Sequence, residues 1–301
     1  MVRILATDGI ESSAAKALTD LGFEVVQQFY DEKELPSKAA EYDVIVVRSA
    51  TKIRKPVIDT AAAGRLKLVI RGGVGIDNID AEYAKEKGIE VQNTPLASTD
   101  SVAELVIAHL FSLARFIYDA NVTMRAGKWE KKRYEGIELA GKTLGLIGMG
   151  RIGRSVAKKA SGLGMNVIYT DITGHLPVNE PFKFVSQDEI FAKADFISLH
   201  VPKTNAPIIN EGTISKMKDG VYLINTARAQ LIDTKALIKA LDSGKIAAAA
   251  LDVFDEEPVK DPAVYNHPKI SMTPHIGAAT VEAQGRIGEN IVSIISEKFK
   301  K

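Results

Sequence analysis

The sequence predicts an α/β protein built on parallel sheets, and two observations lead to that prediction. Strand-like and helix-like segments alternate along most of the chain, as they do where helices connect neighbouring parallel strands. One stretch, residues 142–171, also reads as a strand, a glycine turn, a helix and a second strand that ends in an acid. This succession predicts a doubly wound, Rossmann-type sheet. A length of 301 residues allows about two such domains.

Three glycines in the middle of this stretch predict a dinucleotide site. Gly148 permits a tight turn, Gly150 lets the backbone approach a pyrophosphate, and Gly153 lets the helix lie close to the strand. Arg151 and Ile152 begin that helix, whose unpaired N–H groups would face the pyrophosphate. A glycine turn that serves only as a connection is the alternative, but the flanking strand and helix both fit the nucleotide pattern.

The acid at the end of the second strand favours NAD over NADP. Asp171 stands where a carboxylate accepts the ribose hydroxyls of the adenosine half. The same carboxylate would repel a 2′-phosphate, and residues 172–174 supply no cation for one. We therefore expect NAD as the cofactor.

Composition excludes several classes of protein. The 39 basic and 38 acidic residues give a formal charge of +1, so neither nucleic acid nor an acidic membrane is an expected partner. The chain has no cysteine, which excludes disulfides, thiolate catalysis and cysteine-ligated metal, and we expect no metal site. The N-terminal run MVRILATDGI is too short for a signal peptide or a membrane span. A cytoplasmic location is expected.

The first 95 residues predict a small parallel unit with loops that suit an anion. Strands are expected at residues 3–6, 24–28, 44–48, 66–70 and 89–92, and a helix at residues 12–21. Two of these strands lead into arginine loops, Arg48-Ser49-Ala50-Thr51-Lys52 and Arg71-Gly72-Gly73-Val74-Gly75. The N–H groups of a glycine-rich loop at a strand end can form an anion-binding concavity. An ordinary turn is the alternative for the glycine loop.

Residues 101–126 predict one long helix. Ser101 and Glu104 have the spacing of a capping box, apolar residues keep helical spacing behind them, and Gly127 suits a C-terminal stop. About 25 residues is long for a helix of a globular protein, so its wide apolar face predicts contact with a second domain or a second subunit. His109 lies on that face and is expected to be a packed histidine, or one whose hydrogen bonds are satisfied, rather than a ligand.

The rest of the chain predicts the remaining strands of the doubly wound sheet. Strands are expected at residues 195–200, 221–225, 247–252 and 270–273, with helices at residues 211–217 and 234–241. Residues 280–301 form an amphipathic pattern with a cationic end, which agrees with a final helix.

Three polar residues at strand ends suggest acid–base chemistry on a small acid: Arg228, Glu257 and His275. Histidine suits proton transfer to or from a hydroxyl during hydride transfer, and a neighbouring carboxylate would orient its ring. The guanidinium could bind a substrate carboxylate at two points and polarise a carbonyl. Taken singly, each could instead be a surface ion pair, a solvated acid or a turn residue. His200 is the rival base, although its place before Val201-Pro202 equally suits lining the nicotinamide side of the site.

Motifs along the whole chain resemble the D-2-hydroxyacid dehydrogenase family, in the family's order: RGGVGIDNID, GMGRIG, SLHVP, NTAR, DVFDEEP and TPHIGAAT. The resemblance implies that Arg228, Glu257 and His275 are the catalytic residues. Beyond the glycine motif and Asp171, it implies cofactor contacts from His200, Val201, Pro202, Thr226, Ala227, Asp252 and Gly277. It also implies an NAD domain at residues 97–279 and a smaller flavodoxin-like substrate domain at residues 1–96 and 280–301, with the active site in the cleft between them.

Within the family, the chain is most similar to the branch of D-3-phosphoglycerate dehydrogenases, through VRSATK, RGGVGIDN and AGKWEKKRYEGIELAGKTLG. This implies NAD-dependent oxidation of D-3-phosphoglycerate to 3-phosphohydroxypyruvate, the first step of L-serine biosynthesis. The implied substrate-binding residues are Arg48, Ser49, Arg71, Gly73, Val74, Gly75 and Lys131. A homodimer through the 101–126 helix is also implied, with Lys131 reaching in from a neighbouring subunit or a mobile loop. No C-terminal regulatory domain is expected.

Other functions stay open. Within the same class, the alternative is a reductase of glyoxylate, hydroxypyruvate or another small 2-keto acid. From different classes, the alternatives are an NAD-sensing binding protein on a dehydrogenase scaffold, which the retained catalytic residues argue against, and a nucleotide-binding structural subunit. Two departures from the family bear on substrate preference: Ala229 and Gln230 stand where two glycines are usual, and Ser98 where asparagine is common.

Overall fold

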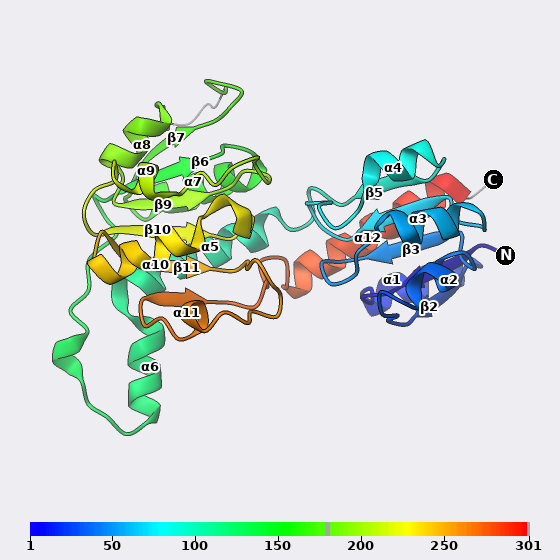
Figure 1. The fold of residues 1–301 in the computed structure, drawn as a ribbon, viewed down its shortest axis with the longest axis horizontal. Coiled ribbons are helices and arrows are strands. Elements are labelled where there is room, and N and C mark those ends of the chain that lie inside the picture. Colours follow the sequence, from blue (N-terminus) through cyan, green and yellow to red (C-terminus); the bar gives the residue numbers. More distant parts are fainter. Residues whose placement is uncertain (178–180, 300–301) are drawn as a thin grey trace. The chain divides into compact units, whose positions relative to one another are not determined.

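The computed structural model describes residues 1–177 and 181–299, and the chain forms two compact units. The first unit contains residues 1–98 and the segment that begins at Ala278, and the second contains Thr99–Gly277. Each unit has its own sheet, in which all strand pairs are parallel (Figure 1). The predicted α/β class, with a Rossmann-type sheet, is confirmed.

The first unit is a five-stranded sheet in the order β2-β1-β3-β4-β5, which is the flavodoxin-like order. Its strands are β1 (Arg3–Ala6), β2 (Glu24–Gln27), β3 (Val44–Val47), β4 (Leu68–Arg71) and β5 (Glu90–Asn93). Its helices are α1 (Ser12–Asp20), α2 (Leu35–Ala39), α3 (Lys55–Ala62), α4 (Ala81–Glu86) and α12 (Val281–Phe299).

The core of this unit lies on both faces of the sheet. All four residues of β3 are buried, as expected for a central parallel strand covered by helices on each side. Ile45 and Val47 pack in a cluster with residues of α2, α3 and α4, whereas Val44 and Val46 pack in a second cluster with residues of α1 and α12. The last helix of the chain therefore completes one face of a sheet whose strands all come from the first 93 residues.

The second unit is a seven-stranded sheet in the order β12-β11-β10-β9-β6-β7-β8. Its strands are β6 (Thr143–Ile147), β7 (Asn166–Thr170), β8 (Lys183–Phe184), β9 (Phe196–Leu199), β10 (Val221–Asn225), β11 (Ile246–Leu251) and β12 (Ile270–Met272). The strand order reverses at β6, which lies between β7 and β9. Ligands of doubly wound sheets bind outside the strand carboxyl ends at such a reversal.

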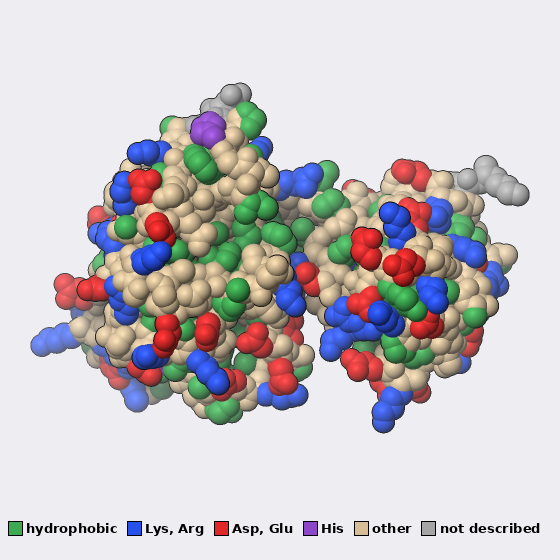
Figure 2. Space-filling view, turned by 45° about the horizontal axis from the view of Figure 1, so that its top comes forward, with side chains coloured by type: hydrophobic (Ala, Val, Ile, Leu, Met, Phe, Trp, Pro, Cys, Tyr) green, Lys and Arg blue, Asp and Glu red, His purple; other side chains and the backbone are tan. Residues whose placement is uncertain are grey.

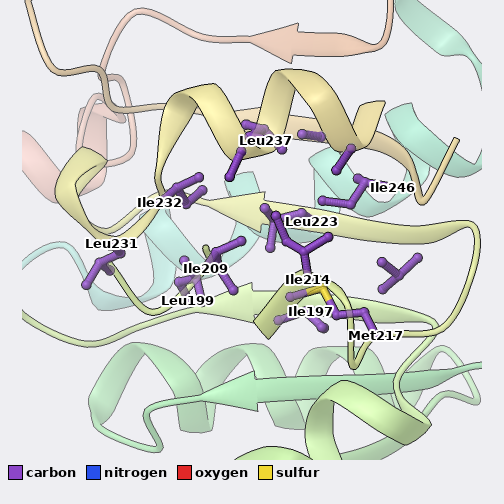
Figure 3. Packing of buried hydrophobic residues seen from close by; sticks show 14 of the residues in the cluster. Ile197, Leu199, Ile209, Ile214, Met217, Leu223, Leu231, Ile232, Leu237 and Ile246 are labelled. Carbon is purple, nitrogen blue, oxygen red and sulfur yellow. The ribbon is translucent and has the colours of Figure 1, made fainter. Parts of the chain in front are cut away.

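Helices on both faces cover this sheet. The helices of the second unit are α5 (Thr99–Arg115), α6 (Ile117–Arg125), α7 (Arg151–Gly162), α8 (Gln187–Lys193), α9 (Glu211–Ile214), α10 (Thr234–Ser243) and α11 (Pro262–Tyr265), with the short 3₁₀ turns η1 (Lys131–Arg133) and η2 (Ala229–Leu231). Figure 3 shows part of the core beneath α10, where Leu237 faces Leu223 of β10 and Ile197 of β9 belongs to the same cluster.

The prediction of one unbroken helix over residues 101–126 was wrong. Phe116 has a φ of 54°, a left-handed conformation, and it separates α5 from α6. The two helices are bent by 66° at this break. Most side chains along one stripe of α5 are buried, whereas α6 buries none of its residues. One apolar pattern along the sequence therefore corresponds to two helices, of which α5 packs in the core and α6 is mostly exposed.

The predicted capping box at Ser101 was also wrong. α5 begins at Thr99, so Ser101 lies inside the first turn, where it is buried and its hydroxyl donates to the carbonyl oxygen of Gly277 (2.7 Å). Glu104 instead faces Lys159 of α7 at 3.9 Å. The predicted stop is correct, because Gly127 follows α6 with a φ of 72° and donates to the carbonyl of Met124.

Basic and acidic side chains are interspersed over the face of each unit that Figure 2 shows. Many of them form ion pairs with near neighbours, such as Arg54 with Asp80 and Lys193 with Glu189. Within residues 1–177 and 181–299, no single helix is long and apolar enough to cross a membrane. Among the helices of these described residues, only the bent pair α5 and α6, taken together, meets that test of length and composition.

Candidate active site

The glycine turn between β6 and α7 is tightly built on one side and open on the other. Gly148 has a φ of 99°, and a Cβ there would lie 2.6 Å from the carbonyl oxygen of His200. A Cβ on Gly153 would overlap the carbonyl oxygen of Gly148, so α7 can pack this closely only with glycine at that position. A Cβ on Gly150, in contrast, would meet nothing within 4 Å. The open side is therefore at Gly150.

Several features of this turn fit a dinucleotide. No side chain caps the start of α7, whose N-cap is Gly150, so the first N–H groups of the helix are available to a phosphate. Arg151 and Ile152 form the first turn, exposed and half-buried respectively. The hydroxyl oxygen of Thr226, directly after β10, is buried and has no hydrogen-bond partner within the described residues. A buried polar atom of this kind needs an explanation, which a bound cofactor would supply.

Asp171 is tied to the glycine turn. Its carboxylate accepts from the N–H of Met149 (2.8 Å) and from both the N–H and the hydroxyl of Thr173 (3.0 and 2.8 Å). Partial burial alone would raise the pKa of Asp171, but these hydrogen bonds outweigh burial and hold the pKa below its usual value. The side chain is therefore a fixed carboxylate beside the turn at neutral pH.

The other expected cofactor residues follow strand ends at the same edge of the sheet as the glycine turn. Because all seven strands are parallel, the segments after β9, β10, β11 and β12 all leave from that edge. They carry His200, Val201, Pro202, Thr226, Ala227, Asp252 and Gly277. The predicted catalytic residues Arg228, Glu257 and His275 lie on three of these segments.

His275 and Glu257 form a hydrogen-bonded pair. Nδ1 of His275 lies 2.7 Å from Oε2 of Glu257, and the other carboxylate oxygen accepts from the N–H of Phe254 (3.2 Å). Partial burial would raise the pKa of Glu257, but the hydrogen bond and charge of His275, the N–H of Phe254 and the charge of Arg228 lower it below its usual value. A carboxylate only accepts, so Nδ1 carries the proton and Nε2 of the neutral ring is left as a base.

Arg228 belongs to the same group, since its charge lowers the pKa of Glu257. Its own conformation is set by β10, because the side-chain amide of Asn225 donates to the Arg228 carbonyl (2.8 Å). The next residues form η2, and Ala229 and Gln230 both have negative φ. The backbone here does not need the two glycines that are usual in the family.

His275 sits in a turn that is braced by Asp252. The φ of His275 is 53°, a left-handed conformation that is uncommon for a residue other than glycine and that persists where surrounding contacts hold it. The buried carboxylate of Asp252 accepts from the N–H groups of Ile276 and Gly277 (both 2.9 Å) and from the hydroxyl of Thr273 (2.6 Å). Asp252 thus holds the backbone on both sides of the histidine.

His109 of α5 extends this brace. It is buried, and its Nε2 lies 3.3 Å from the Thr273 hydroxyl oxygen. The single hydroxyl proton of Thr273 is committed to the Asp252 carboxylate, so Nε2 of His109 must be the donor in this contact. Burial lowers the pKa of His109, against the charge of Asp252. The prediction that His109 is packed or satisfied rather than a ligand is confirmed, but the sequence did not identify its partner, which is 164 residues away.

His200 differs from His275 in its surroundings. Its Nε2 lies 2.9 Å from the hydroxyl of Ser198, which is fully buried. Burial lowers the pKa of His200 to about 4, so at neutral pH the ring is uncharged and a weak base. The low pKa of His200 and the carboxylate partner of His275 therefore favour His275 as the base.

In the first unit, the glycine loop after β4 is held to the end of β5. The side-chain amide of Asn93 donates to the carbonyl of Val74, and the N–H of Thr94 donates to that of Gly73 (3.0 Å). Gly73 has a φ of 150°, and a Cβ there would overlap the guanidinium of Arg71. Val74 is exposed, Gly75 is half-exposed, and the buried hydroxyl of Thr94 has no partner within the described residues.

The loop after β3 carries Arg48 and Ser49. Arg48 is half-buried and Ser49 is exposed. Lys52, which follows the loop, pairs with Glu32 at 3.4 Å. Lys131, the remaining predicted substrate residue, is exposed in η1 of the second unit.

A cavity of about 710 Å³ lies between α10 and the segment after β11. It does not include the glycine turn or His275, and its walls are formed by Leu237, Leu251 and Phe254 among others. Its link to the site is Phe254, whose N–H donates to Glu257.

A doubly wound sheet, an open glycine turn and a histidine–carboxylate pair together define a dinucleotide-dependent oxidoreductase. Residues 107–277 match the family described as "D-isomer specific 2-hydroxyacid dehydrogenase, NAD binding domain". The chain belongs to the D-2-hydroxyacid dehydrogenase family, and its cofactor is NAD.

Relatives and solved structures agree with this assignment. The chain is 46% identical to a hydroxypyruvate reductase of Thermotoga maritima, over 99% of this chain and 98% of that protein. It is 45% identical to a D-3-phosphoglycerate dehydrogenase of Methanocaldococcus jannaschii, over 100% of this chain but only 57% of that protein. Its structure is similar to that of an NAD-dependent formate dehydrogenase from Staphylococcus aureus in complex with NAD, with a TM-score of 0.88 and 28% identity over 100% and 96% of the two chains.

Proposed function

We propose that the protein oxidises D-3-phosphoglycerate to 3-phosphohydroxypyruvate, with NAD, as the first step of L-serine biosynthesis. The observation that carries the chemistry is the His275–Glu257 pair, whose Nδ1 contact of 2.7 Å leaves Nε2 for the substrate. Bound NAD supplies the acceptor for the hydride that leaves C2. Nε2 of His275 takes the proton of the C2 hydroxyl, and in the reverse direction the protonated ring returns it.

The roles of the other residues follow from their chemistry. Glu257 holds the imidazole in place and keeps the proton on Nδ1, because its carboxylate can only accept. Arg228 binds the carboxylate and the C2 oxygen, since a guanidinium offers paired donors to both. Arg48 and Arg71, with Ser49, Gly73 and the N–H groups of Val74 and Gly75, bind the acid and its phosphate. Lys131 adds a further cation.

The glycine turn and the strand ends of the second unit hold the cofactor in this proposal. The pyrophosphate meets the N–H groups at the start of α7, and Asp171 accepts the adenosine ribose hydroxyls. Residues after β9, β10, β11 and β12 line the nicotinamide half, and the unsatisfied hydroxyl of Thr226 finds its partner there.

The second candidate is a hydroxypyruvate or glyoxylate reductase. It is favoured by the 46% identity to the Thermotoga maritima protein, almost the whole of which the chain matches. The chain spans only about half the length of the phosphoglycerate dehydrogenases it matches, 57% in the Methanocaldococcus jannaschii protein. Both candidates share the proton-transfer pair and differ only in the acid that is bound.

Initial-rate measurements of NADH oxidation decide between them. We expect kcat/KM for 3-phosphohydroxypyruvate to exceed that for hydroxypyruvate, glyoxylate and pyruvate by at least about 100-fold, because an analogue that lacks the phosphate offers no anion to the cations proposed to bind it. Preference for an unphosphorylated acid would transfer the assignment to the reductase. Absence of turnover with all four would instead support an NAD-sensing binding protein.

A homodimer in the cytoplasm is part of this proposal. The apolar residues Ile117, Tyr118, Val122 and Met124 of α6 are all exposed, and the single tryptophan, Trp129, is 77% exposed beyond the helix. A second copy of the chain would cover them, as an exposed apolar patch of this kind often marks an interface. Light scattering gives the mass, and Trp129 fluorescence should shift to the red when dilution separates the subunits.

A further inference from the structure

The loop that carries Arg48 and Ser49 is held by a residue from another strand. Asp8 follows β1, which is next to β3 in the sheet. One oxygen of its carboxylate accepts from the N–H of Arg48 (2.6 Å) and the N–H of Thr51 (3.1 Å), and the other accepts from the Thr51 hydroxyl (2.6 Å). Both carboxylate oxygens are therefore used on a single four-residue loop.

The side chain of Asn78 binds the backbone carbonyl oxygens of the same two residues, Arg48 and Thr51. The amide nitrogen of Asn78, beyond the glycine loop, donates to the carbonyl oxygens of Arg48 (2.8 Å) and Thr51 (2.6 Å). The backbone carbonyl of Asn78 in turn accepts from the N–H of Ile53 (2.9 Å). Asp8 and Asn78 thus fix the first and last residues of the loop from both sides.

The two residues between these fixed points are the exposed ones. Ser49 and Ala50 are exposed, whereas Thr51 is only 4% exposed. Charge-assisted hydrogen bonds to a carboxylate are stronger than neutral ones, so this carboxylate limits the conformations open to the loop. Because Asp8 adds a negative charge near residues expected to bind an anion, it is suited to placing the loop rather than to contacting the acid.

We propose that Asp8 is a positioning residue for the substrate acid, and that with Asn78 it presents Arg48 and Ser49 to the acid. The inference rests on the proposed role of Arg48 and Ser49, but it holds for any 2-keto acid that they bind. It assigns Asp8 no contact with substrate or cofactor. All the groups involved belong to the first unit.

Kinetics of Asp8→Ala and Asp8→Asn test the proposal. The substrate for this test is 3-phosphohydroxypyruvate or hydroxypyruvate, whichever the wild-type enzyme prefers. We expect Asp8→Ala to raise KM for that acid by about 10-fold or more. We expect kcat to stay within about twofold of the wild-type value and the Kd of NADH to stay unchanged. That split identifies lost binding of the acid. Asparagine has the same shape, can accept both N–H groups and can donate to the Thr51 oxygen, so Asp8→Asn should bring KM to within about threefold of the wild-type value.

Asp31→Ala is the matched control. The Asp31 carboxylate also accepts two backbone N–H groups, of Lys33 and Glu34 (2.8 and 2.9 Å), but in an exposed loop without a predicted substrate residue. Hydrogen exchange at residues 48–51 should become faster in Asp8→Ala and stay unchanged in Asp31→Ala. If Asp8→Ala does not fold, Thr51→Val removes only the hydroxyl contact and should raise KM about threefold.

The outcomes separate this inference from the proposed function. If the wild-type enzyme prefers hydroxypyruvate, the phosphoglycerate assignment fails. The role of Asp8 is then tested by comparing KM for hydroxypyruvate in the wild type and in Asp8→Ala. An unchanged KM in folded Asp8→Ala, or in Thr51→Val where only that variant folds, overturns the positioning role. The positioning role also fails if Asp8→Ala lowers Tm while KM stays at the wild-type value, or if Asp8→Asn is as impaired as Asp8→Ala.

Discussion

The glycine turn of the second unit and the arginine loop of the first are both built at the carboxyl ends of parallel strands, yet they are held in different ways. The glycine turn is marked by residues within one short stretch, because Gly148 takes a positive φ and Gly153 packs against the carbonyl of Gly148, although Gly148 also lies against the carbonyl of His200. The arginine loop is held by Asp8 and Asn78, which are 40 and 30 residues away from Arg48. A local motif can be recognised in sequence, whereas a loop braced from a distance cannot.

The largest expected effect is the loss of kcat in a variant of the second unit, His275→Ala. It contrasts with the change in KM that we expect from a variant of the first unit, Asp8→Ala. His275→Ala removes the proton acceptor, and we expect kcat to fall by about 10²–10⁴-fold, the usual contribution of a general base. NADH affinity, measured by fluorescence titration, should stay unchanged. This is the reverse of the pattern expected for Asp8→Ala, and near-normal turnover in His275→Ala would contradict the assignment.

The second prediction uses pH to distinguish the two units. All five histidines, at positions 109, 175, 200, 267 and 275, lie in the second unit. The pKa of His200 is about 4 in the folded protein and about 6.5 when unfolded, so below pH 6.5 the unfolded state binds the extra proton. Protonation of the unfolded state therefore has no effect above pH 7 and lowers the free energy of unfolding progressively as the pH drops, by about 3 kcal/mol at pH 4.

Denaturant unfolding between pH 7 and pH 4.5, followed by hydrogen exchange in each unit, checks this prediction. We expect the free energy of unfolding of the second unit to decrease over that range, with His109 acting in the same direction because burial also lowers its pKa. The control is His200→Gln, in which the free energy of unfolding should depend less steeply on pH. An equal slope in His200→Gln would show that burial of this ring is not its source.

The third prediction tests whether the glycine turn is specified locally. A Cβ on Gly153 overlaps the Gly148 carbonyl, so Gly153→Ala should lower the free energy of unfolding by about 1–3 kcal/mol. Gly150→Ala meets open space and should cost less than about 1 kcal/mol, yet raise the Kd of NADH about 10-fold because the backbone can no longer approach the pyrophosphate. Chemical denaturation and NADH titration of both variants give the comparison. Equal losses of stability would show that close packing at Gly153 does not specify the turn.

The smallest expected effect concerns the brace behind His275. Thr273→Val removes the hydroxyl between His109 and Asp252, and we expect a loss of about 1–2 kcal/mol in the free energy of unfolding together with a severalfold lower kcat. Thr273→Ser keeps the hydroxyl and should restore both. A valine variant with wild-type kcat would mean that the two backbone N–H groups alone suffice to hold the turn.

The sequence alone predicted those features whose residues repeat at a regular spacing or lie close together along the chain. Strand β6, the glycine turn, helix α7 and strand β7 follow one another within residues 142–171, in the order that this stretch predicted. The break at Phe116 could not be predicted, because no glycine or proline marks it and the helical period continues through it. A bulky residue adopts a left-handed φ only where surrounding contacts outweigh the local preference.

Residues that act through distant partners gave no sequence signal. Asp8 reads as a loop acid and His109 as a core histidine, since their partners are 40 or more and 164 residues away. The grouping of Arg228, Glu257 and His275 was predictable from their strand ends. The bracing by Asp252 of the turn that carries His275 was not, because it depends on backbone N–H groups that no side-chain pattern reveals.

The packing of α12 has a consequence for the order in which the protein can fold during synthesis. Ile287, Ile291 and Ile295 of this helix fill the core on one face of a sheet whose five strands emerge from the ribosome first. Until that helix has been made, the face is covered only in part, by α1, whereas the second unit, residues 99–277, is contiguous. The second unit can therefore fold on the ribosome before the sheet of the first unit has been completed by α12.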